Sequence, residues 1–394
     1  MSEEWEDQPP RIDDAWDGAA FALAADRLDT PDVIAAADPG DMLRQVASAA
    51  AQVRTALRSC AETDLSAFAP AARPRAIVVA GMGGSGVAGG ILGVICGQGS
   101  PVQVVTVGSP RLPAWSGAVD LVVAVSASGT TPETLAVATE AARRGCPLVA
   151  VGAEGSPLHR VAEQARGTFI GTVQAGAGQA GVGRAGAGSG GSVLPRQSLW
   201  ALTVPLLVIA ERLGIARVGA DVYELAAQRL EEVSHQCRPA SESFVNPGKS
   251  LALDLAGMFP LIWGTSALSG IAAARFASQL HENAKYPAIA GVLPEAMHNQ
   301  LAILDGPFAG DSPMFPLRLI LLADVDSREH AAISNLAEQR GVGVSELAME
   351  GEHPLVRLAT VVQLTDYASV YLGIASGIDP GQAHPIRDLP APIE

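Results

Sequence analysis

Short apolar runs rich in β-branched residues recur along the first half of the chain. The runs are AIVVA (76–80), VQVVTV (102–107), LVVAV (121–125) and PLVAVG (147–152). Stretches with helical spacing, such as Thr134 to Arg144, lie between them. In a parallel sheet covered by helices, strands are buried on both faces and read as continuous apolar runs. The alternation therefore predicts an α/β domain built on a parallel sheet.

The second half repeats this pattern. FPLIWGTSALSGIAAARFASQL (259–280) has the strand–turn–helix order of IVVAGMGGSGVAGGILGVI (77–95), and LRLILLADV (317–325) is another buried strand. Helices are expected from Val222 to Gln236 and from about Thr365 to Ser376. Two similar α/β halves usually hold a ligand in the crevice between them.

These patterns predict two domains after a short lead-in. Residues 1–40 form an acidic lead-in with a helical patch near 19–28, and an Ala-rich helix follows over 41–62. The first domain extends over 41–215, and the second domain with its C-terminal helical segment over 216–394. Inside the first domain, the Gly/Ala-rich tract 171–192 cannot bury enough surface to order itself, so we expect a flexible insertion.

The acidic balance of the chain limits its partners. The formal net charge is −15 over 394 residues, and aromatic residues make up 4%. An acidic surface repels phosphate backbones, and scarce aromatics leave few platforms for stacking bases. We therefore expect no nucleic-acid partner, although one local pocket of N–H groups can still hold a small phosphate.

Cysteine usage and the start of the chain favour a cytoplasmic protein. The cysteines are scattered and form no CxxC or Cys/His cluster, so no metal site is expected. The opening MSEEWEDQPPRIDD is acidic and polar, unlike a signal peptide. No apolar run reaches the length of a membrane span without a Gly, Pro or charge, so no membrane partner is expected. The cysteines are Cys60, Cys96, Cys146 and Cys237.

A glycine-rich turn follows the first strand. Residues 81–86, GMGGSG, match the GxGxxG pattern of dinucleotide-binding proteins. That interpretation requires an acidic residue after the second strand, where Gly108-Ser109-Pro110 stands instead. The same glycines let a backbone and a helix N-terminus approach any anion, and Ser85 adds a hydroxyl. A tight turn that only packs a helix on a strand is the structural alternative.

A cluster of hydroxyls follows the third strand. The segment 126–134, SASGTTPET, places four hydroxyls before the proline that suits a first helical position. A helix cap needs one hydroxyl, whereas hydroxyls together with free N–H groups make a cradle for a phosphomonoester. No Walker lysine follows, so a nucleoside triphosphate is not favoured.

The segment from His281 to Gln300 carries the candidate acid–base chemistry. Glu282 and His298 lie sixteen positions apart in HENAKYPAIAGVLPEAMHNQ. A helix that reaches Lys285 must end before Pro287, so we expect a loop bracketed by helices. A carboxylate base and an imidazole acid can move protons between adjacent carbons and open a sugar ring. A solvated charge and a structural histidine are the alternative.

Taken together, these motifs resemble the sugar isomerase (SIS) fold, in which an SxSGxTxET segment binds the phosphate of a phosphosugar. The chain is most similar to the bifunctional phosphoglucose/phosphomannose isomerases of that superfamily. The elements that carry the resemblance are GMGGSGVAGG, SASGTTPETL, ENAK, LPEAMHN and DYASVYLGIASGIDP, between about residues 76 and 380. The resemblance implies two SIS-type (flavodoxin-like) domains, each a parallel sheet flanked by helices.

The resemblance also implies an activity. It is the interconversion of glucose 6-phosphate or mannose 6-phosphate with fructose 6-phosphate through a cis-enediol, with no metal and no redox cofactor. Glu282 would move the proton between C1 and C2, and His298 would assist ring opening from the partner subunit of a homodimer. Arg196, in LPRQSLW, would stabilise the enediolate, with Arg184 as a weaker alternative. The sugar phosphate would be bound by Gly83, Gly84, Ser85, Ser126, Ser128 and Thr131.

One departure from the family opens a second interpretation. The family has a lysine near its C-terminus that contributes to ring opening, where this chain has Leu389-Pro390 and no lysine beyond Lys285. His384 is a candidate substitute. If ring opening is lost, the chain would be a phosphosugar-binding regulatory protein with little or no turnover. The tract 171–192, which precedes Arg196, is either a mobile lid or a surface insertion without a role that costs little stability.

Overall fold

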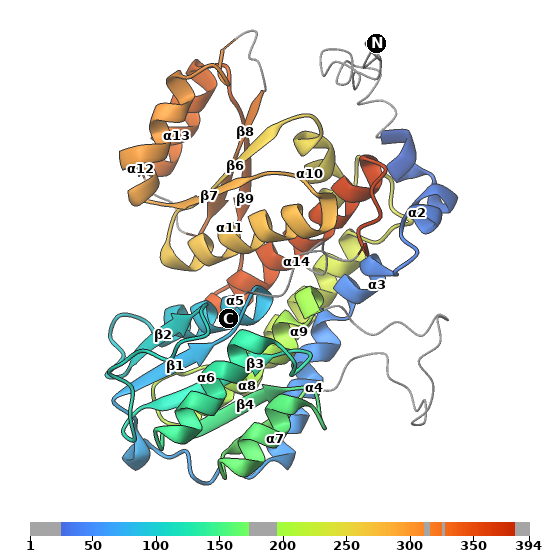
Figure 1. Cartoon of the computed structure of the whole chain (residues 1–394). Helices are drawn as coiled ribbons and strands as arrows, with labels where there is room; N and C mark the ends of the chain where they lie inside the picture. Colours follow the sequence, from blue (N-terminus) through green and yellow to red (C-terminus); the bar gives the residue numbers. More distant parts are fainter. Residues whose placement is uncertain (1–24, 173–194, 311–315, 325–327, 383–394) are drawn as a thin grey trace, which may run out of the picture.

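Two parallel sheets, each flanked by helices, form the framework of the computed structural model, which describes residues 25–172, 195–310, 316–324 and 328–382 (Figure 1). The first sheet has the strand order β2-β1-β3-β4-β5 and the second the order β7-β6-β8-β9, and every neighbouring pair is parallel. The predicted α/β class, with a flavodoxin-like sheet in each half, is confirmed.

The four apolar runs of the first half are strands. Strands β1, β3 and β4 are buried at every residue, whereas the edge strand β2 is only partly buried. A fifth, short strand β5 at the other edge was not predicted, because its four residues are mostly half-buried. The strands are β1 (Ala76–Ala80), β2 (Gln103–Val107), β3 (Leu121–Ser126), β4 (Leu148–Gly152) and β5 (Thr168–Gly171), and the connecting helices are α5 (Gly84–Cys96), α6 (Pro132–Arg143) and α7 (Pro157–Gln164).

The second sheet contains two strands that the sequence pattern did not predict. Strand β7 is short, with four half-buried residues and a glycine among them, and β9 carries polar residues and is half-buried or exposed throughout, so neither has the pattern of a buried strand. The strands are β6 (Phe259–Gly264), β7 (Ile289–Val292), β8 (Leu317–Ala323) and β9 (Gly343–Ala348), flanked by α10 (Pro247–Leu255), α11 (Ala267–Gln279), α12 (Glu295–Asn299) and α13 (Arg328–Gln339).

Long helices lie between the two sheets (Figure 1). α14 (Pro354–Ala375) packs against α9, α10 and α11, while α5 of the first domain contacts α11 of the second. The expected helix from Thr365 begins earlier, at Pro354, and its apolar window is 94% buried inside the protein although it is long enough to cross a bilayer. The remaining helices are α2 (Pro31–Ala37), α3 (Met42–Ala47), α4 (Ala49–Glu62), α8 (Leu199–Arg212) and α9 (Ala220–Gln236).

Candidate functional site

The strand order of the first sheet places its ligand crevice between β1 and β3. The chain adds β2 on one side of β1 and β3 on the other, and this reversal leaves a gap at the carboxyl ends of the two central strands. Ala80 of β1 is in register with Ala124 of β3, so the segments that follow both strands leave the same edge side by side. The structure therefore brings the glycine turn and the hydroxyl cluster together.

The glycine turn is shaped for close approach by a ligand. Gly83 has φ +53°, a left-handed conformation that favours glycine, and α5 begins at the next residue. A Cβ at Gly81 would come within 2.8 Å of the Ser85 backbone. Ser85 is 9% exposed, and its N–H donates to the Met82 carbonyl. The turn thus directs the start of α5 at the crevice, while the Ser85 hydroxyl lies largely beneath the surface.

Within the hydroxyl cluster, buried and exposed side chains have different roles. Ser126 is 1% exposed, and its Oγ accepts the Gly129 N–H (3.0 Å) and is hydrogen-bonded to Thr131 Oγ1 (2.9 Å). Ser128 and Thr130 are exposed, with their hydroxyls 2.9 Å apart. Ser126 therefore fixes the loop, and Ser128 and Thr130 present hydroxyls to solvent. Thr130 was not among the predicted ligands, although it lies in the same hydroxyl run.

Helix α6 begins directly after this loop. Thr131 is its N-cap residue but makes no side-chain cap, and Pro132 occupies the first turn. The first N–H groups of a helix have no intrahelical partner and carry partial positive charge. The loop hydroxyls and this helix end together form a cradle whose chemistry fits a phosphate ester.

Glu282 lies on a π-helical turn that continues α11. The turn spans Leu280–Ala284 and ends at Lys285, which has φ +56° and donates its N–H to the Leu280 carbonyl. Such turns often occur at functional sites. The prediction that the helix ends before Pro287 is confirmed. The expectation of a simple loop over 281–300 is wrong, because that segment also contains β7, which pairs with β6, and the short helix α12.

Arg196 lies beside Glu282. Its Nε is 3.8 Å from Glu282 Oε2 and donates to Asn283 Oδ1 at 2.9 Å, while Nη2 donates to the Pro380 carbonyl at 2.5 Å. The Arg196 side chain is 9% exposed and that of Glu282 is 26% exposed. Burial lowers the pKa of Arg196, opposed by the charges of Glu282 and Asp379. The short helix that carries Arg196 (Pro195–Gln197) also contacts α5, so the pair of Arg196 and Glu282 lies near the helix that follows the glycine turn.

A closed ring of buried hydrogen bonds holds Arg196 in place. Asn283 accepts from Arg196 and donates to Ser369 (2.9 Å), and Ser369 donates to the backbone carbonyl of Asp366 (2.7 Å). The Asp366 carboxylate binds Arg275 through two hydrogen bonds, and Arg275 donates back to the Arg196 carbonyl (3.3 Å). All five residues are at most 9% exposed. Sequence reasoning missed this ring, although charged residues inside the apolar stretches IAAARFA and QLTDYASV were a usable signal.

His298 is separated from Glu282 by the second sheet. The π-helical turn precedes β7 and α12 follows it, so the two residues lie at opposite ends of a strand of four residues, about 13 Å long. Figure 1 shows α12 beside α13, on the side away from the first domain. The His298 side chain is exposed and forms no hydrogen bond or ion pair with any described residue. The structure therefore unites Glu282 with Arg196 but not with His298 of the same chain.

Three of the candidates predicted from the sequence lie outside the described residues: Arg184, His384 and most of the tract 171–192. Lys285 is described, and its ammonium donates to the Glu282 carbonyl oxygen at 2.6 Å. Burial and the charge of Arg196 lower the pKa of Lys285. No group of three or more His, Cys, Asp or Glu side chains suited to a metal occurs in the described part of the chain.

Comparisons with known proteins place this geometry in context. Residues 244–391 match the family described as the bacterial phospho-glucose isomerase C-terminal SIS domain. The chain is 27% identical to a bifunctional phosphoglucose/phosphomannose isomerase of Caldicellulosiruptor bescii, over 77% of this chain and 85% of that protein. It is 28% identical to a protein of the same description from Aquifex aeolicus, over 78% and 86%.

Solved structures share the fold at lower identity. A hypothetical protein of Thermus thermophilus superposes with a TM-score of 0.64 at 16% identity, covering 94% of this chain and 92% of that one. The C-terminal domain of glucosamine-fructose-6-phosphate aminotransferase from Francisella tularensis gives 0.62 at 16% identity, covering 86% and 98%. These likenesses establish the arrangement of the two sheets.

Proposed function

We propose that this chain, which belongs to the SIS-fold family of bifunctional phosphoglucose/phosphomannose isomerases, interconverts glucose 6-phosphate and mannose 6-phosphate with fructose 6-phosphate. The observation that carries the proposal is the Arg196–Glu282 pair, held beside the helix that leaves the glycine turn. A carboxylate base next to a fixed cation is what an enediol mechanism requires, and the proposal has the phosphate cradle of the first sheet hold the same substrate.

Each group has a distinct task in this mechanism. The hydroxyls of Ser128, Thr130 and Thr131 and the N-terminus of α6 hold the phosphate. Glu282 takes the proton from C2 of the open-chain aldose and returns it to C1, while the proton of the C2 hydroxyl moves to the oxygen at C1, so that the oxygen at C2 becomes the ketone. The Arg196 guanidinium stabilises the negative charge that develops on the enediolate oxygens.

Ring opening is assigned to His298 of the partner subunit. A general acid must reach the ring oxygen within hydrogen-bonding distance, and His298 lies across the second sheet from Glu282 in its own chain. Its exposed imidazole, which has no partner among the described residues, is available to a second copy. The active unit is then a homodimer with two shared sites.

The direct test is a coupled assay for fructose 6-phosphate formation from each aldose phosphate. The Glu282→Gln substitution keeps the shape of the side chain but removes the base, and we expect kcat to fall about 10²- to 10⁴-fold. Ser109→Ala, on the exposed turn after β2, is a matched control that should keep full activity. Equal rates for wild type and Glu282→Gln would refute the assignment of the base.

A second candidate function is phosphosugar binding without turnover. The observation that favours it is the absence of any lysine beyond Lys285, since the family's C-terminal lysine assists ring opening. This candidate predicts a rise in melting temperature with glucose 6-phosphate but no product from the natural, cyclic substrate. Turnover by purified protein, abolished by Glu282→Gln, would eliminate it.

A further inference from the structure

Glu282 and Arg196 lie close together without forming the usual ion pair of an arginine and a carboxylate. Arg196 Nε is 3.8 Å from Glu282 Oε2, and the Glu282 carboxylate accepts no hydrogen bond from any residue that the structure describes. Arginine normally binds a carboxylate at about 2.7–2.9 Å, often through two parallel hydrogen bonds. Arg275 and Asp366 of the same ring meet at 2.6 Å. Other groups must therefore take the hydrogen bonds of Arg196.

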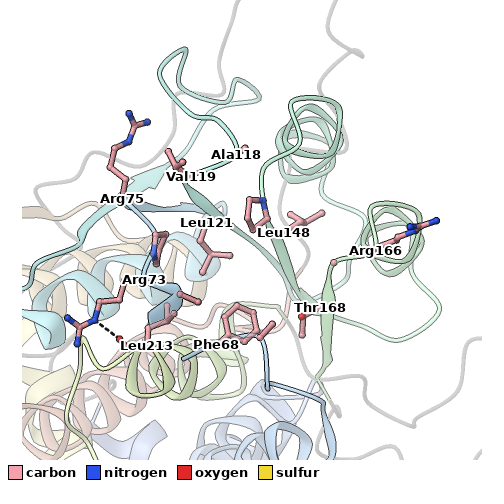
Figure 2. Close-up of a pocket in the computed structure, with 15 residues that line it drawn as sticks. Phe68, Arg73, Arg75, Ala118, Val119, Leu121, Leu148, Arg166, Thr168 and Leu213 are labelled. Carbon is pink, nitrogen blue, oxygen red and sulfur yellow. Dashed lines mark hydrogen bonds between the residues drawn. The ribbon is translucent and has the colours of Figure 1, made fainter. Parts of the chain in front are cut away.

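Figure 2 shows two arginines that illustrate the ordinary ways in which this chain holds a guanidinium. Arg75 binds the carboxylate of Asp120 through two hydrogen bonds, of 2.9 and 2.6 Å. Arg73 donates to two backbone carbonyls, one of them that of Leu213, and no described carboxylate lies within 4 Å of it. Arg196 differs from both, because it donates only to uncharged oxygens although a carboxylate lies within 4 Å.

Asn283 accepts the hydrogen that would otherwise reach Glu282. Its Oδ1 accepts the Nε–H of Arg196 at 2.9 Å, and the Pro380 carbonyl accepts from Nη2. Both acceptors are uncharged, so Arg196 is held in place while its positive charge is not neutralised. Nη1 of Arg196 makes no hydrogen bond with a described residue, which leaves that end of the guanidinium for substrate oxygens.

The orientation of the Asn283 amide is fixed from its other side. Asn283 is fully buried, and Nδ2 donates to Gln279 Oε1 at 3.0 Å and to Ser369 Oγ at 2.9 Å. A rotated amide would turn its NH2 group toward the Nε–H of Arg196 and would leave both of these acceptors without its hydrogens, which is unfavourable in a buried site. Gln279 is 2% exposed and is itself held by the side chain of Gln197 at 3.3 Å. The surroundings therefore direct Oδ1 at Arg196.

We propose that Asn283 is a positioning residue that keeps Arg196 from closing onto Glu282. The carboxylate then stays free of a hydrogen-bonded ion pair and can take the proton from C2, while the guanidinium keeps its charge for the enediolate. Gln279 acts one step further away, by holding the Asn283 amide in the required orientation. The inference rests on the isomerase activity proposed above, whose base and cation it concerns.

Asn283→Leu tests the inference in the coupled assay. Leucine has nearly the shape of asparagine but accepts no hydrogen bond, so the Nε–H of Arg196 should turn to Glu282. We expect kcat to fall about 100-fold, with KM changed less than about twofold, because a misplaced catalytic group slows the reaction without weakening phosphate binding. Gln279→Met leaves Asn283 in place but removes one of its acceptors, and kcat should fall about three- to tenfold.

A second buried glutamine separates positioning from stability. Gln363 is 1% exposed, and its amide donates to the Val46 carbonyl and to Ser234, outside the site. Gln363→Met should lower the melting temperature about as much as Gln279→Met but leave kcat unchanged. An equal fall of kcat in both variants would show that lost stability slows the reaction, and it would overturn the proposal. This comparison decides the matter if Asn283→Leu does not fold.

A double variant shows whether Asn283 acts through Arg196. Once Arg196→Ala has removed the guanidinium, no cation remains to close onto Glu282, so adding Asn283→Leu should lower kcat by less than about twofold. If the two losses multiply instead, Asn283 acts by another route and the proposal is wrong.

A crystal structure of Asn283→Leu tests the inference without turnover. We expect the distance from Arg196 Nε to Glu282 Oε2 to shorten from 3.8 Å to about 2.8 Å. A distance that stays near 3.8 Å would overturn the inference, whether or not the protein is an isomerase. Wild-type protein that forms no fructose 6-phosphate, with the shortened distance in the variant, would refute the proposed function and leave the role of Asn283 in spacing the pair intact.

Discussion

Position 129 of the hydroxyl loop accepts glycine far more readily than any other residue. Its φ is +65°, and a Cβ there would overlap both Oγ and Cβ of Ser156. Gly155 has a similar φ of +67° but open space around it. Alanine substitutions at the two positions therefore separate the free-energy cost of a left-handed backbone from that of a steric clash.

Gly129→Ala should destabilise the protein far more than Gly155→Ala. We expect a loss of about 1 kcal/mol for Gly155→Ala, from backbone strain alone. For Gly129→Ala we expect about 3 kcal/mol or more, because strain and overpacking act together. Urea denaturation measures both values, and KM for the sugar phosphate should rise only in Gly129→Ala. Equal losses in the two variants would show that Ser156 moves aside freely.

The ion pair between Asp120 and Arg75 makes the stability of the protein depend on pH, and this ion pair is remote from the proposed active site. Hydrogen bonds from Arg75 lower the pKa of Asp120, and the Gly117 N–H adds to this effect. A carboxyl with a lower pKa in the folded state contributes stability above its unfolded value of about 3.9. This contribution is lost as the pH falls through the folded-state pKa.

Asp120→Asn should therefore lower the free energy of unfolding at pH 7 by about 1–3 kcal/mol, because the buried acceptor loses its charge-assisted hydrogen bonds. It should also flatten the dependence of stability on pH below about pH 4. Chemical denaturation from pH 3 to pH 7 measures both effects. A variant with the same acid slope as wild type would show that other carboxylates dominate it.

At the scale of elements, the buried centre of each sheet was predictable and its edges were not. Strands β1, β3 and β4 are apolar at every position because helices cover both faces, and that pattern is visible in the sequence. β7 and β9 are half-exposed, so their residues carry little periodic signal. Pro287 located the end of the helix that bears Glu282, but a π-helical turn depends on packing against α14, which no local pattern encodes.

The candidate site, too, was only partly predictable from the sequence. The glycine and hydroxyl segments were recognisable because each follows a strand directly, and parallel pairing then places them side by side. The ring that positions Arg196 joins residues 196, 275, 283, 366 and 369, and only the packing of three helical segments brings them together. The sequence shows only that Arg275 and Asp366 lie inside apolar stretches, and it does not show which groups they pair with.

This ring predicts that Asp366 acts on catalysis through Arg196. Asp366→Asn keeps the size of the side chain but removes the charge that orients Arg275, which in turn holds the Arg196 carbonyl. We expect kcat to fall about 10- to 100-fold with little change in KM, because small displacements of a catalytic group are costly. Asp120→Asn, in another ion pair remote from the site, is the control and should leave kcat unchanged.

A readout independent of turnover makes this prediction specific. The Arg196 Nε–H donates to Asn283 and is buried, so its exchange with solvent should be slow in wild type and fast in Asp366→Asn. Nitrogen-15 NMR of the arginine side chains, with Arg196→Lys for assignment, measures this directly. Slow exchange together with reduced kcat would show that Asp366 acts by a route other than Arg196.

At the scale of the whole molecule, the two sheets face the proposed site with opposite ends of their strands. The first sheet contributes the carboxyl ends of β1 and β3, whereas Glu282 enters from the end of the second sheet where β7 begins. α12 and His298 follow β7 at the other end. One chain therefore places Glu282 and Arg196 at one location and His298 at another, so the ring-opening role that we propose for His298 requires a second chain.

Mixing inactive variants tests this arrangement. Glu282→Gln and His298→Ala subunits, denatured and refolded together in equal amounts, should recover roughly a quarter of wild-type activity, because half of the randomly assorted dimers are mixed and each mixed dimer has one intact site of two. Glu282→Gln mixed with Arg196→Ala should recover none, since Glu282 and Arg196 serve the same site from the same chain. No recovery in the first mixture while both variants fold would place His298 in the site of its own chain or outside catalysis. Recovery in the second mixture would show that Glu282 and Arg196 of different chains serve one site.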